Sequence, residues 1–143
     1  MKLFTIGFTK SSAEHFFARL CGSGATKLVD VRLNNVSQLA GFARKDDLRY
    51  FCGAICGLDY EHLPRLAPTE EMLAEYRRSK LSWSGYARKF LALMARRKIE
   101  TLDRSLLGGA CLLCSEAEPH HCHRRLVAEY LQRKWGDVEI VHI

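Results

Sequence analysis

Two thiols, a carboxylate, several imidazoles and a guanidinium lie close together in one short segment, Cys114-Ser-Glu116-Ala-Glu-Pro119-His-His-Cys122-His123-Arg124. An apolar run precedes this segment and a helical pattern follows it, so the segment is predicted to join the end of a strand to the start of a helix. Many α/β proteins place their binding and catalytic groups at such a junction. The residue types suit nucleophilic, acid–base or metal chemistry.

Cys122 is a predicted nucleophile of this segment. If Pro119 occupies the first position of the helix, Cys122 lies in the first turn. The helix dipole and a neighbouring His or Arg lower the pKa of a thiol placed there. The alternative is that Cys122 faces the core as a small apolar side chain. Arg124 and the unpaired amides of the same turn would suit a phosphate or carboxylate group.

Glu116, His62 and Asp30 are also predicted to act in catalysis, and His123 could assist them. Glu116 follows a strand end, where a general base or a carboxylate nucleophile is often found, and His62 and His123 could exchange protons with it. Asp30 interrupts an apolar strand pattern, so it is predicted to be at least partly buried. A buried carboxylate needs a partner. It either pairs with an arginine or loop amides, or it orients a catalytic group or a substrate hydroxyl.

A metal site and a redox pair are the competing chemistries for the same segment. Cys114, Cys122 and His123, with Glu116 or His62, could supply tetrahedral nitrogen and sulfur ligands. Adjacent residues on a helix diverge by about 100°, which argues against Cys122 and His123 binding one ion. No metal ligand is therefore assigned, and the cofactor is left unknown. Cys114 and Cys122 could also approach each other closely enough to form a disulfide.

The elements that must position these residues alternate between strands and helices. Strands are predicted over residues 2–7, 27–32, 58–63, 110–114 and 138–143, and helices over residues 11–21, 46–57, 69–79, 83–98 and 119–134. Residues 33–44 are predicted to form a long loop. Strands separated by helices indicate parallel crossovers. The predicted fold is an α/β, Rossmann-like three-layer sandwich with a mainly parallel sheet of about five strands, whose order the sequence does not reveal.

The strand ends of such a sheet lie along one edge. Polar residues follow four of the predicted strands, which suggests one pocket rather than scattered groups. The predicted catalytic residues are Glu116, Cys122, Asp30 and His62, and the predicted substrate-binding residues are Arg32, Arg124, His123, Thr9 and Cys114.

Length and composition indicate one globular domain over residues 1–143, with 48% hydrophobic and 27% charged residues. No apolar run approaches the roughly 20 residues of a membrane span, and the N-terminal apolar stretch is too short for a signal peptide. The predicted location is the cytoplasm, where thiols stay reduced. Cys21, Cys52, Cys56 and Cys111 are accordingly predicted to be small buried side chains. Cys111 and Cys114, three apart on a strand, should face opposite sides of the sheet.

A formal net charge of +6 favours an anionic partner such as a nucleotide or a nucleic acid. Much of the excess lies in short basic runs such as Arg96-Arg97-Lys98, which are equally consistent with solvated helix ends. The second hypothesis is therefore a non-catalytic basic module that binds nucleic acid with a steep salt dependence. The third is a protein with a structural Cys/His metal site.

The sequence resembles the DUF488 family of uncharacterised bacterial and archaeal proteins. The resemblance is carried by Thr5-Ile6-Gly7, Asp30-Val31-Arg32-Leu33-Asn34, Gly41-Phe42, Tyr60-Glu-His62-Leu63-Pro64, Cys114-x-Glu116-x-x-Pro119-x-x-Cys122-His123-Arg124 and Val141-His142-Ile143. It implies a compact α/β domain and supplies no established reaction. Two positions depart from the family pattern: Phe8 stands where a histidine is frequent, and Asn35 where a proline is frequent.

These observations lead to one principal prediction. The protein is an intracellular enzyme that carries out hydrolysis or group transfer on a phosphate-bearing substrate, such as a nucleotide or a nucleic acid. The substrate would bind at the edge formed by the C-terminal ends of the strands.

Overall fold

A computed structural model describes residues 1–36 and 40–143. Its centre is a sheet of five strands in the order β3-β2-β4-β1-β5, in which all neighbours are parallel. The strands are β1 (Lys2–Gly7), β2 (Lys27–Asp30), β3 (Asp59–His62), β4 (Ala110–Cys114) and β5 (Glu139–His142). The predicted α/β fold with a parallel sheet is confirmed, and β4 at its centre has every residue buried.

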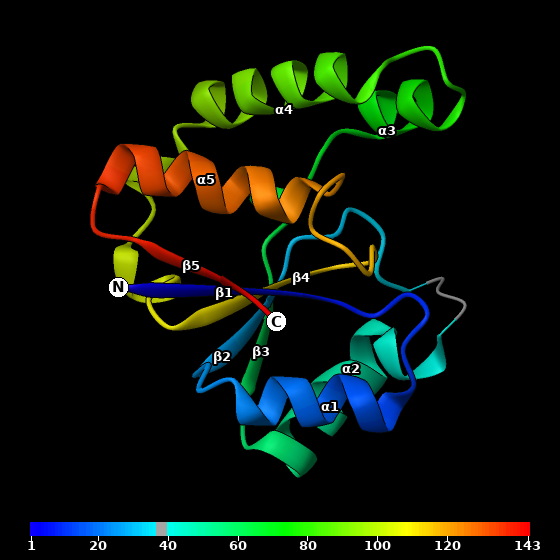
Figure 1. Cartoon of the computed structure of the whole chain (residues 1–143), viewed down its shortest axis with the longest axis vertical. Helices are drawn as coiled ribbons and strands as arrows, with labels where there is room; N and C mark the ends of the chain where they lie inside the picture. The colour runs from blue at the N-terminus through cyan, green and yellow to red at the C-terminus, as the bar shows by residue number, and fades with distance from the viewer. Residues whose placement is uncertain (37–39) are drawn as a thin grey trace.

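Helices cover both faces of the sheet, which gives the three layers of a Rossmann-like sandwich (Figure 1). Helices α1 (Ala13–Gly22) and α2 (Lys45–Phe51) lie on one side, and α4 (Trp83–Arg97) and α5 (His123–Trp135) lie on the other, with α3 (Glu70–Arg77) beside α4. Two apolar cores result, because successive strand side chains point to opposite faces. Cys111 belongs to the α1 side and Cys114 to the α5 side, as predicted.

Several element ends differ from the sequence predictions for local reasons. The second strand ends at Asp30 because the Asp30 carboxylate accepts the backbone N–H of Arg32, which turns the chain out of the sheet. Helix α1 is capped by Ser12, one residue later than the predicted capping box. The predicted loop 33–44 holds a short 3₁₀ turn, Gly41–Ala43, and residues 37–39 of that prediction lie outside the described residues.

A disulfide joins Cys21 at the end of α1 to Cys56, with a Cα–Cα distance of 5.0 Å. Cys56 ends the π-helical turn Cys52–Cys56 that extends α2. The prediction that these two cysteines are free, buried side chains is therefore wrong, and Cys21 is in fact exposed. Cys52 and Cys111 are fully buried free thiols, as predicted. Cross-links of this kind stabilise a fold by about 2–4 kcal/mol, because they restrict the unfolded chain.

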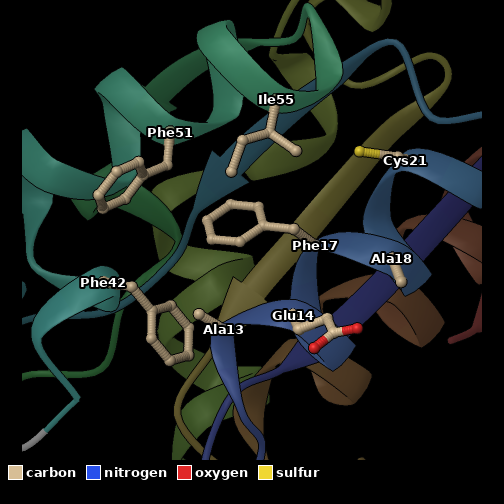
Figure 2. A pocket seen from close by; sticks show the side chains of 8 residues that line it. All are labelled: Ala13, Glu14, Phe17, Ala18, Cys21, Phe42, Phe51 and Ile55. Atoms are coloured by element: carbon tan, nitrogen blue, oxygen red, sulfur yellow. The ribbon is translucent and has the colours of Figure 1, made fainter.

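An apolar hollow of about 310 Å³ lies between α1 and the extended α2 (Figure 2). Phe17, Phe42, Phe51 and Ile55 form most of its surface, and Glu14 is the only acidic or basic side chain among its described lining residues. This hollow lacks the mixed polar groups that catalysis requires. In the part of the chain that the structure describes, none of the helices has the length and apolar character of a membrane span.

Candidate functional site

A cleft of about 760 Å³ opens where β4 ends and α5 begins. Cys114, Cys122 and His123 lie in its lining, and Glu116 and Arg77 are exposed residues of the same lining. Tyr76, Trp83 and Tyr86, from α3 and α4, supply an aromatic wall. The volume is that of a site for a small organic ligand.

The aromatic wall continues as a series of stacked rings. The imidazole of His121 stacks on Trp83 with 4.9 Å between ring centroids. Trp83 stacks on Tyr86 with a centroid distance of 5.4 Å, and Tyr86 stacks on Phe90 with one of 6.2 Å. Phe90 in turn contacts the ring of His123 at 5.4 Å. One side of the cleft is thus aromatic from the exposed His121 to the buried His123.

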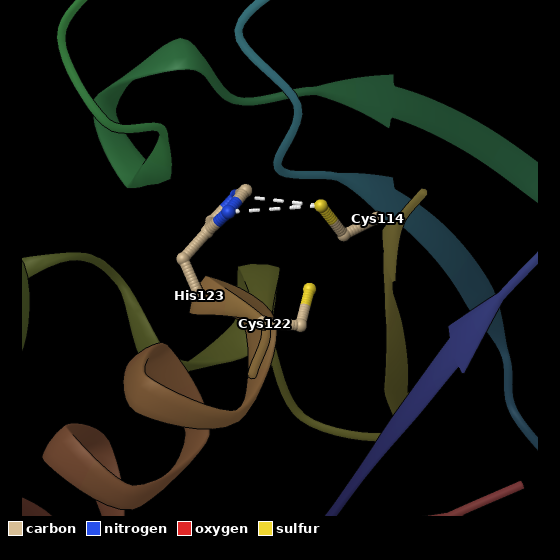
Figure 3. Close-up of side chains that lie close together, drawn as sticks. All are labelled: Cys114, Cys122 and His123. Carbon is tan, nitrogen blue, oxygen red and sulfur yellow. Dashed lines mark hydrogen bonds between the residues drawn. The ribbon is translucent and has the colours of Figure 1, made fainter. Parts of the chain in front are cut away.

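The three ligand-type atoms of Cys114, Cys122 and His123 all lie within 4.8 Å of one another, and all three residues are buried. Figure 3 shows the two thiols and the imidazole converging from the end of β4 and the start of α5. Helix α5 begins at His123, not at Pro119, and Cys122 is its N-cap with extended backbone (φ −136°, ψ 139°). The prediction that Cys122 and His123 diverge as neighbours on a helix is wrong, because only His123 is helical.

Hydrogen bonds define the orientation of the His123 ring. Its Nε2 lies 2.7 Å from the carbonyl oxygen of Val31, at the end of β2. A carbonyl can only accept, so Nε2 carries a proton, and a neutral ring then has its lone pair on Nδ1. Nδ1 lies 3.6 Å from Sγ of Cys114. The imidazole therefore presents an electron pair to the thiols.

The two thiols of the cluster have opposite electrostatic environments. A hydrogen bond from the Cys122 thiol lowers the pKa of Cys114, and the positive charge of Arg124 acts in the same direction. The same hydrogen bond, together with burial, raises the pKa of Cys122 well above its ordinary value. The prediction of a lowered pKa at Cys122 is wrong, because its buried thiol is hydrogen-bonded to the sulfur of Cys114. Cys114 is the better thiolate.

This difference predicts an order of alkylation. Treated with iodoacetamide at about pH 7, the native protein should be modified at Cys114 before Cys122, because the thiolate is the reacting species. Peptide mass spectrometry over a time course measures the order. Cys52 is the internal control: burial raises its pKa to about 12, and it should react only after unfolding. Faster modification of Cys122 than of Cys114 would contradict the assignment.

Asp30 is completely buried and fully engaged by neighbouring groups. Its carboxylate accepts Nε and Nη2 of Arg32 at 2.9 and 2.7 Å, and it accepts the phenol of Tyr60 at 2.5 Å. Burial and the bond to Asp30 raise the pKa of Tyr60, which keeps its proton and remains a donor. Arg32 lines the cleft; its Nε and Nη2 bond to Asp30 and to the carbonyl of Ala43, and its buried Nη1 has no hydrogen-bond partner among the described residues. The structure thus places Asp30 and Arg32 in an ion pair under the cleft.

His62 and Thr9 hold loops near the site. Nε2 of His62 donates to the carbonyl of Arg32 at 2.7 Å, and the Thr9 hydroxyl donates to the carbonyl of Ser115 at 2.6 Å. Neither His62 nor Thr9 is among the described residues that line the cleft. Of the predicted site residues, the cleft is lined by Glu116, Cys122, Cys114, His123 and Arg32. His62 and Thr9 instead bind the backbone of nearby loops.

The side chain of Arg124 donates hydrogen bonds to the loop between β4 and α5. It is 1% exposed, and its Nη1 and Nη2 donate to the carbonyls of Glu116 and Ala117 at 2.5 and 3.3 Å. These bonds use the groups that the sequence analysis assigned to an anion. They also orient the loop so that the Glu116 side chain is exposed in the cleft.

The aromatic wall and Arg77 are parts of the cleft that were not predicted from the sequence. The spacing of Trp83 and Tyr86, three apart in the first turn of α4, was the available signal, because such residues share one helix face. Which face of α4 borders the cleft depends on packing against α5.

The basic run at the end of α4 is partly used inside the fold. Nη1 of Arg97 donates to the carbonyls of Arg65 and Ala67 at 2.7 and 2.8 Å, and burial lowers its pKa. This arrangement favours the structural interpretation of the run over a nucleic-acid surface.

Both departures from the family pattern have a structural role. Phe8 is buried, and the guanidinium carbon of Arg32 lies 5.2 Å from its ring centroid. Asn35 donates from Nδ2 to the Tyr60 hydroxyl at 3.2 Å. The two residues thus pack and hydrogen-bond around the Asp30–Arg32 pair.

A family model described as "Domain of unknown function DUF488" matches residues 12–131. No curated protein and no solved structure matches the chain significantly.

Proposed function

Because the chain belongs to the DUF488 family, whose description assigns no reaction, we propose a function from the cleft itself: it is the active site of an enzyme that hydrolyses, or transfers a group from, a nucleotide-like substrate. The supporting observation is the convergence of two thiols and an imidazole on the lining of a cleft that also has an aromatic wall. Buried reactive groups beside a ligand-sized opening are a common feature of active sites.

The cleft suggests a division of roles. The Trp83–Tyr86 wall suits a flat heteroaromatic ring, and the exposed guanidinium of Arg77 suits a phosphate at the opening. Glu116, two residues after Cys114, would carry protons to and from the reacting groups. A volume of about 760 Å³ fits a mononucleotide better than a polymer. This favours the enzyme over the nucleic-acid-binding module.

Fluorescence titration with a panel of nucleoside monophosphates, followed by chromatography of the products, tests the proposal. We expect one or more of them to change the emission of Trp83, and this response to be absent from Trp83→Phe, which keeps Trp135. Arg77→Gln should raise Kd about tenfold, equivalent to about 1.4 kcal/mol. Arg88→Gln, an exposed arginine on α4, is the matched control and should leave Kd unchanged.

Turnover separates catalysis from binding. Glu116→Gln should keep the emission change and lose turnover by about 10²–10⁴-fold, the contribution of a positioned acid or base. The proposal is wrong if no member of the panel alters Trp83 emission, or if Glu116→Gln turns substrate over at the wild-type rate.

A further inference from the structure

The geometry points to a Zn²⁺ site made by Cys114, Cys122 and His123, with one coordination position open to the cleft. The three ligand atoms come from two rigid elements, β4 and the start of α5, and all lie within 4.8 Å of one another. Two thiolates and one imidazole form a donor set that zinc binds in proteins, and catalytic zinc sites keep the fourth position for water or substrate.

The measured spacing agrees with tetrahedral zinc. Bonds of about 2.3 Å to sulfur and about 2.0 Å to nitrogen, at a tetrahedral angle, separate the two ligand atoms by about 3.5 Å. Sγ of Cys114 and Nδ1 of His123 are 3.6 Å apart. The Cys114–His123 pair thus has the spacing of two zinc ligands, and the sulfur of Cys122 lies within 4.8 Å of both atoms.

The surroundings of His123 are those of a metal ligand. A zinc-bound histidine usually donates its other ring N–H to a carbonyl or carboxylate, which orients the ring and fixes the tautomer. His123 donates from Nε2 to the Val31 carbonyl at 2.7 Å, so Nδ1 faces the two thiols. This bond connects the residue after β2 to α5 across 92 positions of the chain, so the tertiary fold positions the ring.

Cys122 occupies a position where a capping residue would be expected. Serine, threonine, aspartate and asparagine are preferred at an N-cap, because their oxygen accepts a backbone N–H. In the described part of the chain, the side chain of Cys122 makes no such cap bond. A thiol at this position is explained by ligation. The positive end of α5 and the buried guanidinium of Arg124 would offset the negative charge of the thiolates.

The open position extends the proposed function, on which this part of the inference rests. Glu116 lies two residues after Cys114 in the same lining, and its side chain is exposed. A His/Cys/Cys zinc with a glutamate that is not a ligand is the arrangement of zinc enzymes that attack nucleobases with an activated water. The water would lose one proton to the Glu116 carboxylate, and its oxygen would bond to an unsaturated ring carbon while the C=N π-electron pair moves to the adjacent ring nitrogen. Glu116 would pass its proton to that nitrogen. The bond from the ring carbon to an exocyclic amino group would then break, and that group would leave as ammonia with the remaining proton of the added oxygen, which becomes a carbonyl.

Metal binding by the full-length chain tests the site directly. The reduced protein is stripped with a chelator and titrated with Zn²⁺, and the stoichiometry is measured by native mass spectrometry. We expect one zinc per chain in the wild type and at least a hundredfold weaker binding in Cys114→Ser, Cys122→Ser and His123→Ala. Cys52→Ser, which removes a buried thiol in the opposite core, and Glu116→Gln should both retain the ion.

Titration of the wild-type protein with Co²⁺ keeps the inference testable if a variant fails to fold. Cobalt should produce the thiolate charge-transfer and intense d–d bands of a tetrahedral site, and Zn²⁺ should remove them. Zn²⁺ should also protect Cys114 and Cys122 from iodoacetamide. Absence of stoichiometric zinc, octahedral cobalt spectra, or full binding by His123→Ala would each overturn the site. Because nucleotide binding is measured by Trp83 emission without metal, a failed zinc site is distinguishable from a failed proposed function.

Discussion

Replacing Gly7 with alanine should lower the free energy of unfolding by about 3 kcal/mol or more. A Cβ at this position would lie 1.6 Å from the carbonyl oxygen of Glu116 and 3.0 Å from Nη1 of Arg124. The first of these atoms is backbone, and the second belongs to a buried guanidinium that is bonded to the same carbonyl. Neither can move away without displacing the loop that carries Glu116 into the cleft. Urea denaturation followed by tryptophan fluorescence measures the change.

Gly22→Ala is the matched control for that variant. Gly22 ends α1, and apart from its chain neighbours and the backbone of its own helix no described atom lies within 4 Å of the Cβ that alanine would add. We expect its stability to stay the same or to rise slightly, since alanine restricts the unfolded chain. If Gly7→Ala were as stable as Gly22→Ala, the close approach of β1 to the loop after β4 would be incorrect.

The Gly7 contact illustrates which parts of the site a sequence can predict. Apolar runs and helical periodicity identified the strands and the longer helices of the described residues, because these patterns depend on which side of each element is buried. They also placed Cys114 and Glu116 at the end of a buried strand. The close approach of Gly7 to Glu116 joins two segments far apart in the chain, and no local pattern encodes it.

The roles of the arginines could not be predicted for a related reason. Arg32 and Arg124 have the residue type of an anion site; Arg32 follows the end of β2, and Arg124 lies in the first turn of α5. Their actual partners are the Asp30 carboxylate and the carbonyls of Glu116 and Ala117. The sequence does not show which loop carbonyls will need a hydrogen-bond donor, because that depends on how the loop folds. Arg77, which is exposed in the lining of the cleft, is the arginine that the proposed function assigns to the phosphate.

The cluster of Cys114, Cys122 and His123 shows how much one residue at a helix end matters. A helix that began at Pro119 would turn Cys122 and His123 to different faces. The observed start at His123 leaves Cys122 extended, so both side chains reach Cys114. Helix ends are the least predictable feature of a sequence, since capping and tertiary contacts decide them within one or two residues.

Asp30→Ala should lower the free energy of unfolding by about 3–5 kcal/mol. The change leaves the guanidinium of Arg32, which is 2% exposed, without its carboxylate, and it removes the acceptor of the Tyr60 phenol. A buried charge without its partner is costly, because water cannot reach it. Glu75→Ala is the control, since it breaks an ion pair whose lysine, Lys89, is 53% exposed, and it should cost less than about 1 kcal/mol.

Combining Asp30→Ala with Arg32→Met separates the pair from other effects of the substitution. The double variant should be less destabilised than the sum of the single variants by about 1 kcal/mol or more, because it leaves no unpaired charge. Strict additivity would contradict a direct interaction.

The Asp30–Arg32 pair also borders the reactive cluster through the backbone. Val31 lies between the paired residues, and its carbonyl holds Nε2 of His123. The negative charge of Asp30 raises the pKa of Cys114, so the preferential alkylation of Cys114 should increase in Asp30→Ala under conditions where the variant remains folded. Unchanged alkylation in a destabilised variant would limit the role of Asp30 to the stability of the sheet edge. A decrease would show instead that the turn at Val31 positions His123, and that losing this position outweighs the loss of the charge.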